Sequence, residues 1–307
     1  MHFKFSAPGS IMLMGEHAVL RNHLALVGAV DKRITVTLTP QENQQISIYS
    51  ALGNHHTTLD ELKITAPFQF VLTAIQRHLA NIPSGFRLVI HSEFSSKVGL
   101  GSSAAVVVAT IACLIQWLKI PFELHELFLD ARATIQTVQG RASGADVAAS
   151  VFGGVLAYRM DPLLIEKTDH LFDIALLYTG YKTATPEVIR RVDDRVNVDP
   201  EKYAALFKEM NRYSEDAWKA IAKKDWPLLG KFMRLHQYSQ ELLGTCDETS
   251  AQLLGLLNQH PQVLGSKISG SGLGDCLVAL VAPDFKWKHP SFIDATLSAE
   301  GVTCESS

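Results

Sequence analysis

The sequence predicts an α+β protein made of two halves that meet near residue 160. In the first third of the chain, short segments alternate apolar and polar residues at the two-residue period of a β-strand. The second half contains a run of helical segments, followed by two short strands around a glycine-rich turn. This grouping indicates an α+β fold with domains at residues 1–160 and 161–307.

The individual elements follow from periodicity and from turn residues. The first half is predicted to contain strands at 24–30 and 34–38, a helix at 66–80, a strand at 86–90, a helix from 102, a helix at 122–139, a helix from 143 and a strand at 155–158. A linker at 161–173 is expected to lead to a strand at 174–179, helices at 186–192, 200–222, 226–243 and 248–259, and strands at 267–269 and 276–281.

Composition excludes several classes of protein. Of the 307 residues, 47% are hydrophobic and 19% are charged, which is typical of a globular chain with a large core. The formal net charge of −3 gives no basic surplus for binding nucleic acid or an anionic membrane, so neither partner is expected. The uncharged segment 98–118 is long enough for a membrane helix, but its glycine-rich start favours a buried core helix from Ser102.

The cysteines and the N-terminal segment indicate a cytoplasmic protein. Cys113, Cys246, Cys276 and Cys304 form no CxxC pair, and their wide spacing suits reduced, mostly buried thiols. The first residues lack the apolar block of a signal peptide.

The strongest chemical signal is the segment KVGLGSSAA at 97–105. Its glycines let the backbone approach a bulky anion, and a helix that starts at the serines directs free N–H groups toward that anion. The hydroxyls of Ser102 and Ser103 suit phosphate or Mg²⁺. The residues alone leave two alternatives, a phosphate-binding loop and a glycine turn with a serine N-cap.

Two other glycine-containing regions are weaker signals by themselves. SAPGS at 6–10 is expected to form a Pro-Gly turn between short strands, and GEHAV at 15–19 follows it. Glu16 and His17 can line a polar pocket, although in isolation a solvated turn is the better explanation of both. SGSGLGDC at 269–276 allows a backbone cradle, with a hairpin turn as the alternative.

Asp146 is the candidate catalytic group. It lies among small residues in GRASGADVA at 140–148, at the start of a predicted helix. A carboxylate there stays ionised and can be approached closely by a substrate. The alternative is an acid that only stabilises the helix dipole.

Together and in this order, these segments resemble the GHMP kinase superfamily, from Ser6 to about Leu280, and within it most closely the mevalonate kinases. The resemblance implies an ATP-dependent kinase that phosphorylates the mevalonate hydroxyl in isoprenoid precursor synthesis. It also implies an N-terminal domain like ribosomal protein S5 domain 2, a ferredoxin-like C-terminal domain and an active site between them. By this resemblance, 99–103 is a phosphate loop and the cofactors are ATP and Mg²⁺.

The resemblance implies roles for individual residues. Asp146 is the catalytic carboxylate and Ser103 the Mg²⁺ ligand. The acceptor is bound by Ser10, Glu16, His17, Arg141 and Ser143. The ATP phosphates are bound by Lys97, Gly99, Leu100, Gly101, Ser102, Ser103, Ala104, Gly270, Ser271, Gly272 and Gly274.

The chain departs from the mevalonate kinase pattern at three places. Ser10 stands where those enzymes usually carry a catalytic Lys. Either Asp146 and Mg²⁺ then contribute more to the reaction, or another cation such as Lys97, Arg141 or Lys182 replaces that Lys. Ile135 stands where a Glu usually helps to hold Mg²⁺. The last motif carries Asp275 in place of a glycine, which is more like phosphomevalonate kinase.

These departures keep other functions open. A phosphomevalonate kinase, or another GHMP sugar or alcohol kinase, is the first alternative. A phosphorylated acceptor would need extra cations, for which Arg141, Lys182, Arg190 and Arg191 are candidates. A nucleotide-binding protein without catalysis is the second alternative, although Asp146 argues against it. Mevalonate kinases are often dimers, so the resemblance leaves a homodimer open.

Overall fold

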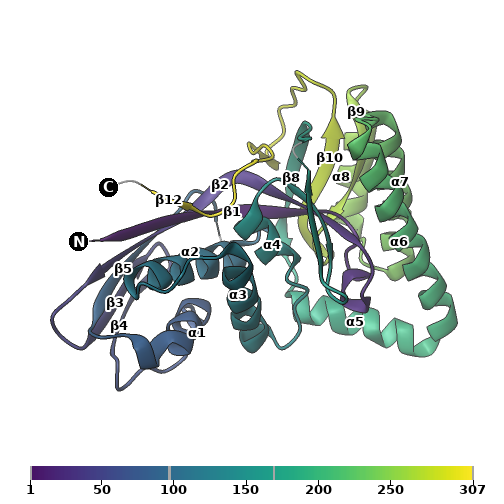
Figure 1. Ribbon diagram of the computed structural model, residues 1–307. Coiled ribbons are helices and arrows are strands. Elements are labelled where there is room, and N and C mark those ends of the chain that lie inside the picture. The colour runs from purple at the N-terminus through teal and green to yellow at the C-terminus, as the bar shows by residue number, and fades with distance from the viewer. Residues whose placement is uncertain (1, 96–97, 169, 306–307) are drawn as a thin grey trace.

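The computed structural model describes residues 2–95, 98–168 and 170–305, which form one eight-stranded and one four-stranded sheet with helices packed against them (Figure 1). This arrangement confirms the predicted α+β class. Figure 1 shows α1, α2 and α3 below the long strands β1 and β2, and α6 and α7 beside β9 and β10.

The eight-stranded sheet is built around the antiparallel pair β1 and β2. Its strands are β1 (Phe3–Met14), β2 (Ala25–Pro40), β3 (Gln45–Ser50), β4 (Gly53–Thr58), β5 (Phe86–Ser92), β6 (Val155–Arg159), β7 (Leu164–Thr168) and β12 (Thr303–Cys304). The main path runs β12-β1-β2-β5-β3-β4, and β6 pairs with both β2 and β7. Only β3 and β5 pair in parallel among these described strands.

Two expectations for this sheet are wrong. The segment 6–10 is not a turn, because β1 continues through Pro8 and Gly9. The pairing register with β2 shifts between Pro8 and Ser10, so the proline, which has no N–H to donate, lies beside a bulge-like irregularity. The predicted strands 24–30 and 34–38 are likewise parts of the single long strand β2.

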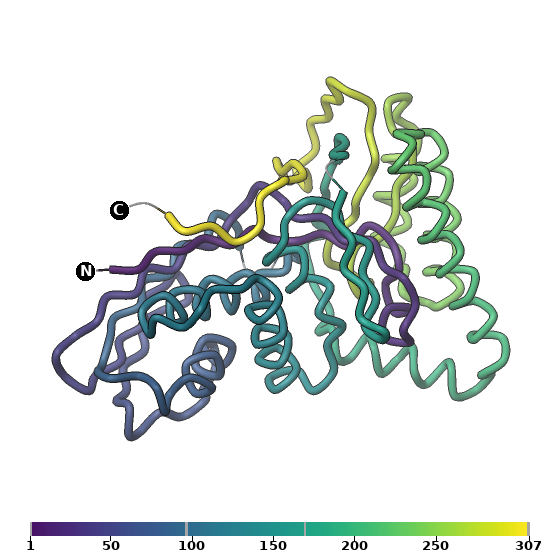
Figure 2. The backbone as a smooth tube through the Cα atoms, viewed as in Figure 1, coloured from purple at the N-terminus to yellow at the C-terminus, as the bar shows by residue number. Residues whose placement is uncertain are grey.

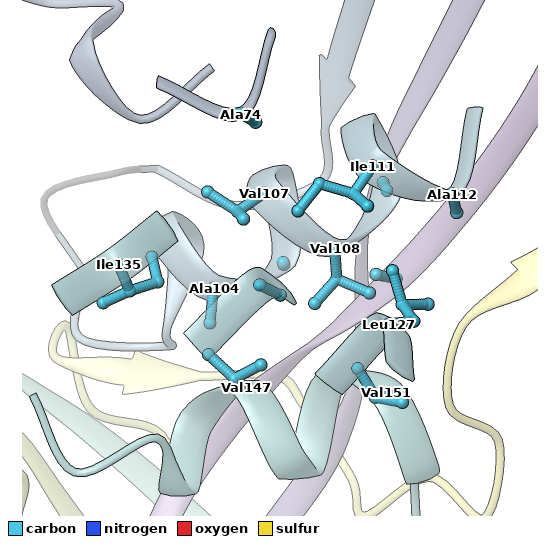
Figure 3. Close-up of a cluster of buried hydrophobic side chains, with 14 of the residues drawn as sticks. Ala74, Ala104, Val107, Val108, Ile111, Ala112, Leu127, Ile135, Val147 and Val151 are labelled. Atoms are coloured by element: carbon cyan, nitrogen blue, oxygen red, sulfur yellow. The ribbon is translucent and has the colours of Figure 1, made fainter. Parts of the chain in front are cut away.

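Four helices cover one face of this sheet: α1 (Gln69–His78), α2 (Ser102–Trp117), α3 (Leu124–Gln139) and α4 (Ala145–Phe152). Figure 3 shows the apolar side chains of Ala104, Val108 and Val147 gathered between α2, α3 and α4. Because α2 is enclosed in this way, it is apolar around its whole circumference. None of the described helices is long and apolar enough to span a membrane.

The four-stranded sheet has the order β11-β8-β10-β9. Its strands are β8 (Ile174–Lys182), β9 (Val263–Ser269), β10 (Gly274–Val281) and β11 (Phe292–Ile293), and its helices are α5 (Thr185–Val198), α6 (Pro200–Ala222), α7 (Trp226–Leu243) and α8 (Glu248–Asn258). The central strand β10 is buried on both faces. Leu277 and Ala279 pack in the cluster that includes residues of α8, whereas Val278 and Leu280 pack in the cluster that includes residues of α6 and α7. The apolar run in β10 follows from this double burial.

Short 3₁₀ turns at Val19–Arg21 (η1) and Leu79–Asn81 (η2) complete the elements. The boundary predicted at residue 160 stays a prediction. Strands from beyond it join the first sheet, since β7 pairs with β6 and β12 pairs with β1. Figure 2 shows the C-terminal segment returning beside the N-terminal strand. The linker expected at 161–173 therefore contains a strand.

Helix α7 and strand β9 approach each other through two glycines. A Cβ atom on Gly230 would lie 2.2 Å from the Leu264 carbonyl oxygen, and one on Gly265 would lie 2.2 Å from the Gly230 carbonyl oxygen. Backbone atoms cannot yield as a side chain can, so neither position accommodates a methyl group.

We expect Gly230→Ala to lower the free energy of unfolding by about 1–3 kcal/mol, the usual effect of overpacking. Gly255→Ala is the matched control, because Gly255 lies in α8 with nothing within 4 Å of an added Cβ. The control should raise stability by about 0.5–1 kcal/mol through helix propensity. Thermal and denaturant unfolding of both variants checks this. Equal effects of the two substitutions would contradict the close approach of α7 and β9.

Candidate active site

A pocket of about 500 Å³ brings most of the predicted site residues together. It is lined by residues that precede or begin α2 and α4 and by residues at the ends of β8 and β9. The predicted site residues that line it are Glu16, His17, Gly99, Gly101, Ser102, Ser103, Ala104, Arg141, Ser143, Asp146, Gly270 and Ser271. Residues predicted to bind phosphate and residues predicted to bind the acceptor therefore share one cavity.

The N-terminus of α2 opens into this pocket. Gly101 caps the helix in the left-handed conformation, with φ of 63°, and as a glycine it provides no side-chain cap for the first turn. The backbone N–H groups of that turn have no partner within the helix, and the helix dipole adds partial positive charge there. Ser102 and Ser103 are partly exposed at the same point. This geometry suits a phosphate group.

Two glycines of this loop are required by protein neighbours. A Cβ atom on Gly99 would lie 1.7 Å from Oδ1 of Asp275, and one on Gly101 would lie 2.0 Å from Oγ of Ser10. Leu100 between them is buried, and its carbonyl oxygen accepts a hydrogen bond of 3.0 Å from the Ser10 N–H. The loop is thus held against β1 on one side and against the turn before β10 on the other.

Asp146 lies in the first turn of α4 and lines the pocket. The hydroxyl of Ser10 donates a hydrogen bond of 2.8 Å to its Oδ1. Burial raises the pKa of the Asp146 carboxyl, and the hydrogen bond from Ser10 and the positive charge of Lys182 oppose the rise. Ser10 itself is buried and contacts Asp146.

Lys182, at the end of β8, also lines the pocket. Its Nζ lies 2.9 Å from Oδ2 of Asp275. Burial raises the pKa of the Asp275 carboxyl, Lys182 opposes the rise, and the negative charge of Asp146 adds to it. The three charged groups are therefore close enough to influence one another.

Glu16 and His17 lie at the inner wall of the pocket and are nearly fully buried. Glu16 forms an ion pair with Nζ of Lys267, which is itself buried in β9. Nε2 of His17 lies 2.9 Å from the Ser271 carbonyl oxygen, so the ring donates its proton to that oxygen. Burial lowers the pKa of His17 to about 4. The acceptor-binding roles of both residues stay predictions. Oε2 of Glu16 has no hydrogen-bond partner among the described residues, whereas Oε1 is held by Lys267.

Arg141 lies at the rim of the pocket. Its Nη1 is 2.6 Å from Oδ2 of Asp193 on α5, and Nη2 of Arg21 is 2.6 Å from Oδ1 of the same carboxylate. One carboxylate thus holds two guanidinium groups at the end of the pocket that α5 covers.

The second glycine-rich turn faces the pocket only in its first half. Gly270 and Ser271 line the cavity. Gly272 packs against Thr245, whose carbonyl oxygen would be 2.4 Å from an added Cβ, and Gly274 packs against the ring of Tyr181. Of the predicted phosphate-binding residues, Leu100, Gly272 and Gly274 therefore do not line the pocket.

Three remaining predictions concern single positions. Lys97 lies outside the described residues. Ser143 lines the pocket, and its hydroxyl accepts a hydrogen bond of 3.2 Å from the Ala145 N–H. Ile135, at the position of the usual metal-binding Glu, is buried in the apolar cluster of Figure 3 and offers no ligand atom.

Several pocket residues carry no clear functional signal in the sequence. Gln69 and Phe70 come from the start of α1, and Thr185 and Ile189 come from α5. A proline after Thr185 marks the start of α5, but nothing in the sequence indicates that this helix lies over the pocket. Ser269 lines the pocket directly before the second glycine turn.

Known protein families and curated proteins match this chain in sequence. Models of the GHMP kinases N terminal domain and the GHMP kinases C terminal domain match residues 67–154 and 217–286. The mevalonate kinase of Archaeoglobus fulgidus is 31% identical, over 98% of this chain and 99% of its own. The chain belongs to the GHMP kinase family. The mevalonate kinase of Aeropyrum pernix is 30% identical to this GHMP kinase, over 90% of this chain and 87% of its own.

A solved structure has the same fold as this GHMP kinase. A crystal structure of a mevalonate kinase superposes with a TM-score of 0.80 at 21% identity, covering 97% of this chain and 99% of its own. The family match and this likeness confirm the predicted kinase class and the two-domain fold.

The low pKa of His17 predicts a pH-dependent contribution to stability. Below pH 6.5 an unfolded chain protonates this imidazole, whereas the folded protein does not until about pH 4. Because the unfolded state then binds the additional proton, the folded state loses up to about 3 kcal/mol as pH falls through this window. We expect His17→Gln to lack this loss.

Denaturant unfolding of both proteins between pH 4 and pH 8 measures the difference. Above pH 7 the difference in unfolding free energy should be constant, which provides the internal reference. Parallel curves down to pH 4 would show that His17 titrates normally.

Proposed function

We propose that this protein is an ATP-dependent mevalonate kinase that transfers the γ-phosphoryl group of ATP to the primary hydroxyl of mevalonate. The observation that carries the proposal is that the free N-terminus of α2 and the carboxylate of Asp146 line one pocket. An anion site and a base are thereby brought to the same cavity, as phosphoryl transfer requires. The full-length similarity to mevalonate kinases supports the choice of acceptor.

In the proposed reaction, the N–H groups of the first turn of α2 and the backbone at Gly270 and Ser271 hold the triphosphate. Asp146 orients the acceptor hydroxyl and accepts its proton late, since the transition state is loose. The acceptor oxygen forms a bond to the γ-phosphorus while the bond to the β–γ bridging oxygen breaks, and ADP leaves. Ser10 fixes the carboxylate of Asp146 through its hydrogen bond.

The pocket suits a Mg²⁺ ion that is held mainly by ATP. Mg²⁺ in kinases is typically bound by one or two carboxylates together with substrate phosphates, and it keeps several waters. The hydroxyl of Ser103 and the carboxylate of Asp146 are oxygen donors in this cavity, and the described residues contain no cluster of three or more His, Cys, Asp or Glu side chains that would form a separate cage. Bound there, the ion would neutralise charge on the phosphate oxygens.

The charge at the rim of the pocket favours a singly charged acceptor. Arg21 and Arg141 share the carboxylate of Asp193, so this group of three carries one net positive charge. Mevalonate has one carboxylate, whereas phosphomevalonate carries an additional phosphate. The other candidate cations are already paired, Lys182 with Asp275, Arg190 with Asp194 and Arg191 with Glu187. This pairing argues against the phosphomevalonate kinase alternative.

Location and assembly are part of the same proposal. The four cysteines are free thiols, which suits a reducing compartment and the expected cytoplasmic location. A homodimer stays a prediction by family resemblance.

The first test is ADP release with Mg-ATP against mevalonate, 5-phosphomevalonate, galactose and homoserine. We expect turnover on mevalonate, and a fall in kcat of about 10²–10⁴-fold in Asp146→Asn, the range for loss of a general base. Ser10→Ala should lower kcat by about tenfold through loss of one charge-assisted hydrogen bond. Asp194→Asn, on the exposed face of α5, is the matched control. Turnover only on the phosphorylated acceptor, or full activity of Asp146→Asn, would refute the proposal.

A second test concerns Arg141. We expect Arg141→Met to raise KM for mevalonate by about 10–100-fold at nearly constant kcat, because a hydrogen bond between charged groups contributes about 1.5–3 kcal/mol. Arg190→Met removes an exposed guanidinium that is paired on α5 and should leave both constants unchanged. A fall in kcat with unchanged KM would place Arg141 at the transferring phosphoryl group instead of the acceptor.

A further inference from the structure

The described lining of the pocket contains few positive charges for the amount of negative charge that the pocket must hold. Among the lining residues that the structure describes, Lys182 and Arg141 are the ones with a fixed positive charge. Arg141 is tied to Asp193 at the rim, under α5. Lys182 is paired with Asp275, whose carboxylate packs against Gly99 of the phosphate loop. Of the described cations that line the cavity, Lys182 is therefore the one beside the phosphate loop.

Asp275 has an unfavourable backbone conformation and an unfavourable position for its carboxylate. Its backbone has φ of 72°, in the left-handed region that glycine adopts more readily, and its side chain is buried. Among the described residues, no side chain donates a hydrogen bond to its Oδ1, which lies 1.7 Å from the position that a Cβ on Gly99 would take. A carboxylate at a phosphate loop also repels the nucleotide unless a cation compensates it. The left-handed backbone, the burial of the carboxylate and its repulsion of the nucleotide are all unfavourable. They are explained if the role of Asp275 is to hold the ammonium of Lys182.

We propose that Lys182 is a catalytic residue whose ammonium, held at the phosphate loop by Asp275, contacts the oxygens of the phosphoryl group during transfer. Asp275 is the positioning residue, which acts through Lys182. This inference rests on the proposed kinase function and deepens it by naming a protein cation for the transfer step.

The geometry of Lys182 suits this role. An ammonium group has three donors, so the contact with Oδ2 of Asp275 leaves two for phosphate oxygens. The side chain lines the pocket and is about one third exposed, at 35%, so a phosphate group can reach the ammonium while Asp275 holds it. Lys182 and Asp146 line the same pocket, and the positive charge of Lys182 opposes the rise in the pKa of the Asp146 carboxyl. A fixed cation stabilises the charge that develops on the transferring group.

The test measures kcat, KM and nucleotide affinity of Lys182→Met, Lys182→Arg and Asp275→Asn. We expect kcat of Lys182→Met to fall about 10²-fold, as for loss of one preorganised donor, while the Kd for ADP changes much less. Lys182→Arg should recover part of the loss because it restores the charge. Lys219→Met is the matched control, since Lys219 forms an exposed pair with Asp216 on α6.

The double variant separates a catalytic ammonium from a structural ion pair. If Asp275 acts through Lys182, Asp275→Asn should lose about tenfold in kcat, and Lys182→Met with Asp275→Asn should be no worse than Lys182→Met alone. If the pair is only structural, all three variants should have a lower Tm and nearly wild-type kcat, which would overturn the inference. A larger loss in Asp275→Asn than in Lys182→Met would also overturn it, because Asp275 would then act directly.

Slow ATP hydrolysis, with water as the acceptor, provides a readout that does not depend on mevalonate. If the wild type phosphorylates none of the four acceptors but hydrolyses ATP, the proposed substrate is wrong. The Lys182 inference then stands or falls on whether Lys182→Met slows that hydrolysis by a similar factor. Unchanged hydrolysis in Lys182→Met would refute the inference by itself.

Discussion

The buried ion pair between Glu16 and Lys267 connects the two halves of the molecule, and the geometry of the site depends on it. Both side chains are almost fully withdrawn from solvent. Charged groups are expensive to bury, so each one is tolerated only because the other is in place, and loss of one partner typically costs about 3–5 kcal/mol. This mutual dependence fixes the turn after β1 against strand β9.

Other polar contacts set the position of the same turn. The Met12 N–H donates to Oγ of Ser269 at 3.0 Å, and the Gly15 N–H donates to Nε2 of His236 at 2.8 Å. Because Nε2 of His236 accepts a hydrogen bond, this buried imidazole is neutral, and burial lowers its pKa well below the ordinary value. The end of β1 is thus bound to α7 and β9 at several points, and the second glycine turn starts from a fixed place.

The same strand then organises the catalytic side of the pocket. The Ser10 N–H holds the loop at Leu100, and the Ser10 hydroxyl holds Asp146. The hydroxyl of Ser150 donates to the Pro8 carbonyl oxygen at 2.9 Å, which ties α4 to β1. Strand β1 therefore positions the phosphate loop, the catalytic carboxylate and the turn that meets β9. A serine at position 10 fits this role because its short side chain lies where an added Cβ on Gly101 would be.

The sequence predicted the parts of this arrangement that depend on local chemistry. The predicted bounds of helices α6 and α7 agree with the structure, in which the Asp199 and Asp225 side chains accept backbone N–H groups at the two starts and a proline lies in each first turn. The start of α2 at Ser102 was predicted from its glycines. The Pro-Gly pair in β1 was misinterpreted because a bulge and a turn use the same residues, and only the pairing partner distinguishes them.

Charge pairs between residues far apart in the sequence are the part of the site that sequence patterns do not predict. Lys267 lies 251 residues from Glu16, and no period or motif relates the two. Asp275 and Lys182 are likewise on different strands, and their pairing follows from the register of β8 and β10, in which Gly274 lies opposite Lys182. That register places a cation from one strand and a carboxylate from the next beside the phosphate loop, which comes from the other half of the chain. A pocket assembled in this way has its charges fixed by sheet geometry before any substrate enters, which is the condition under which a dipole or an ion stabilises a transition state most effectively.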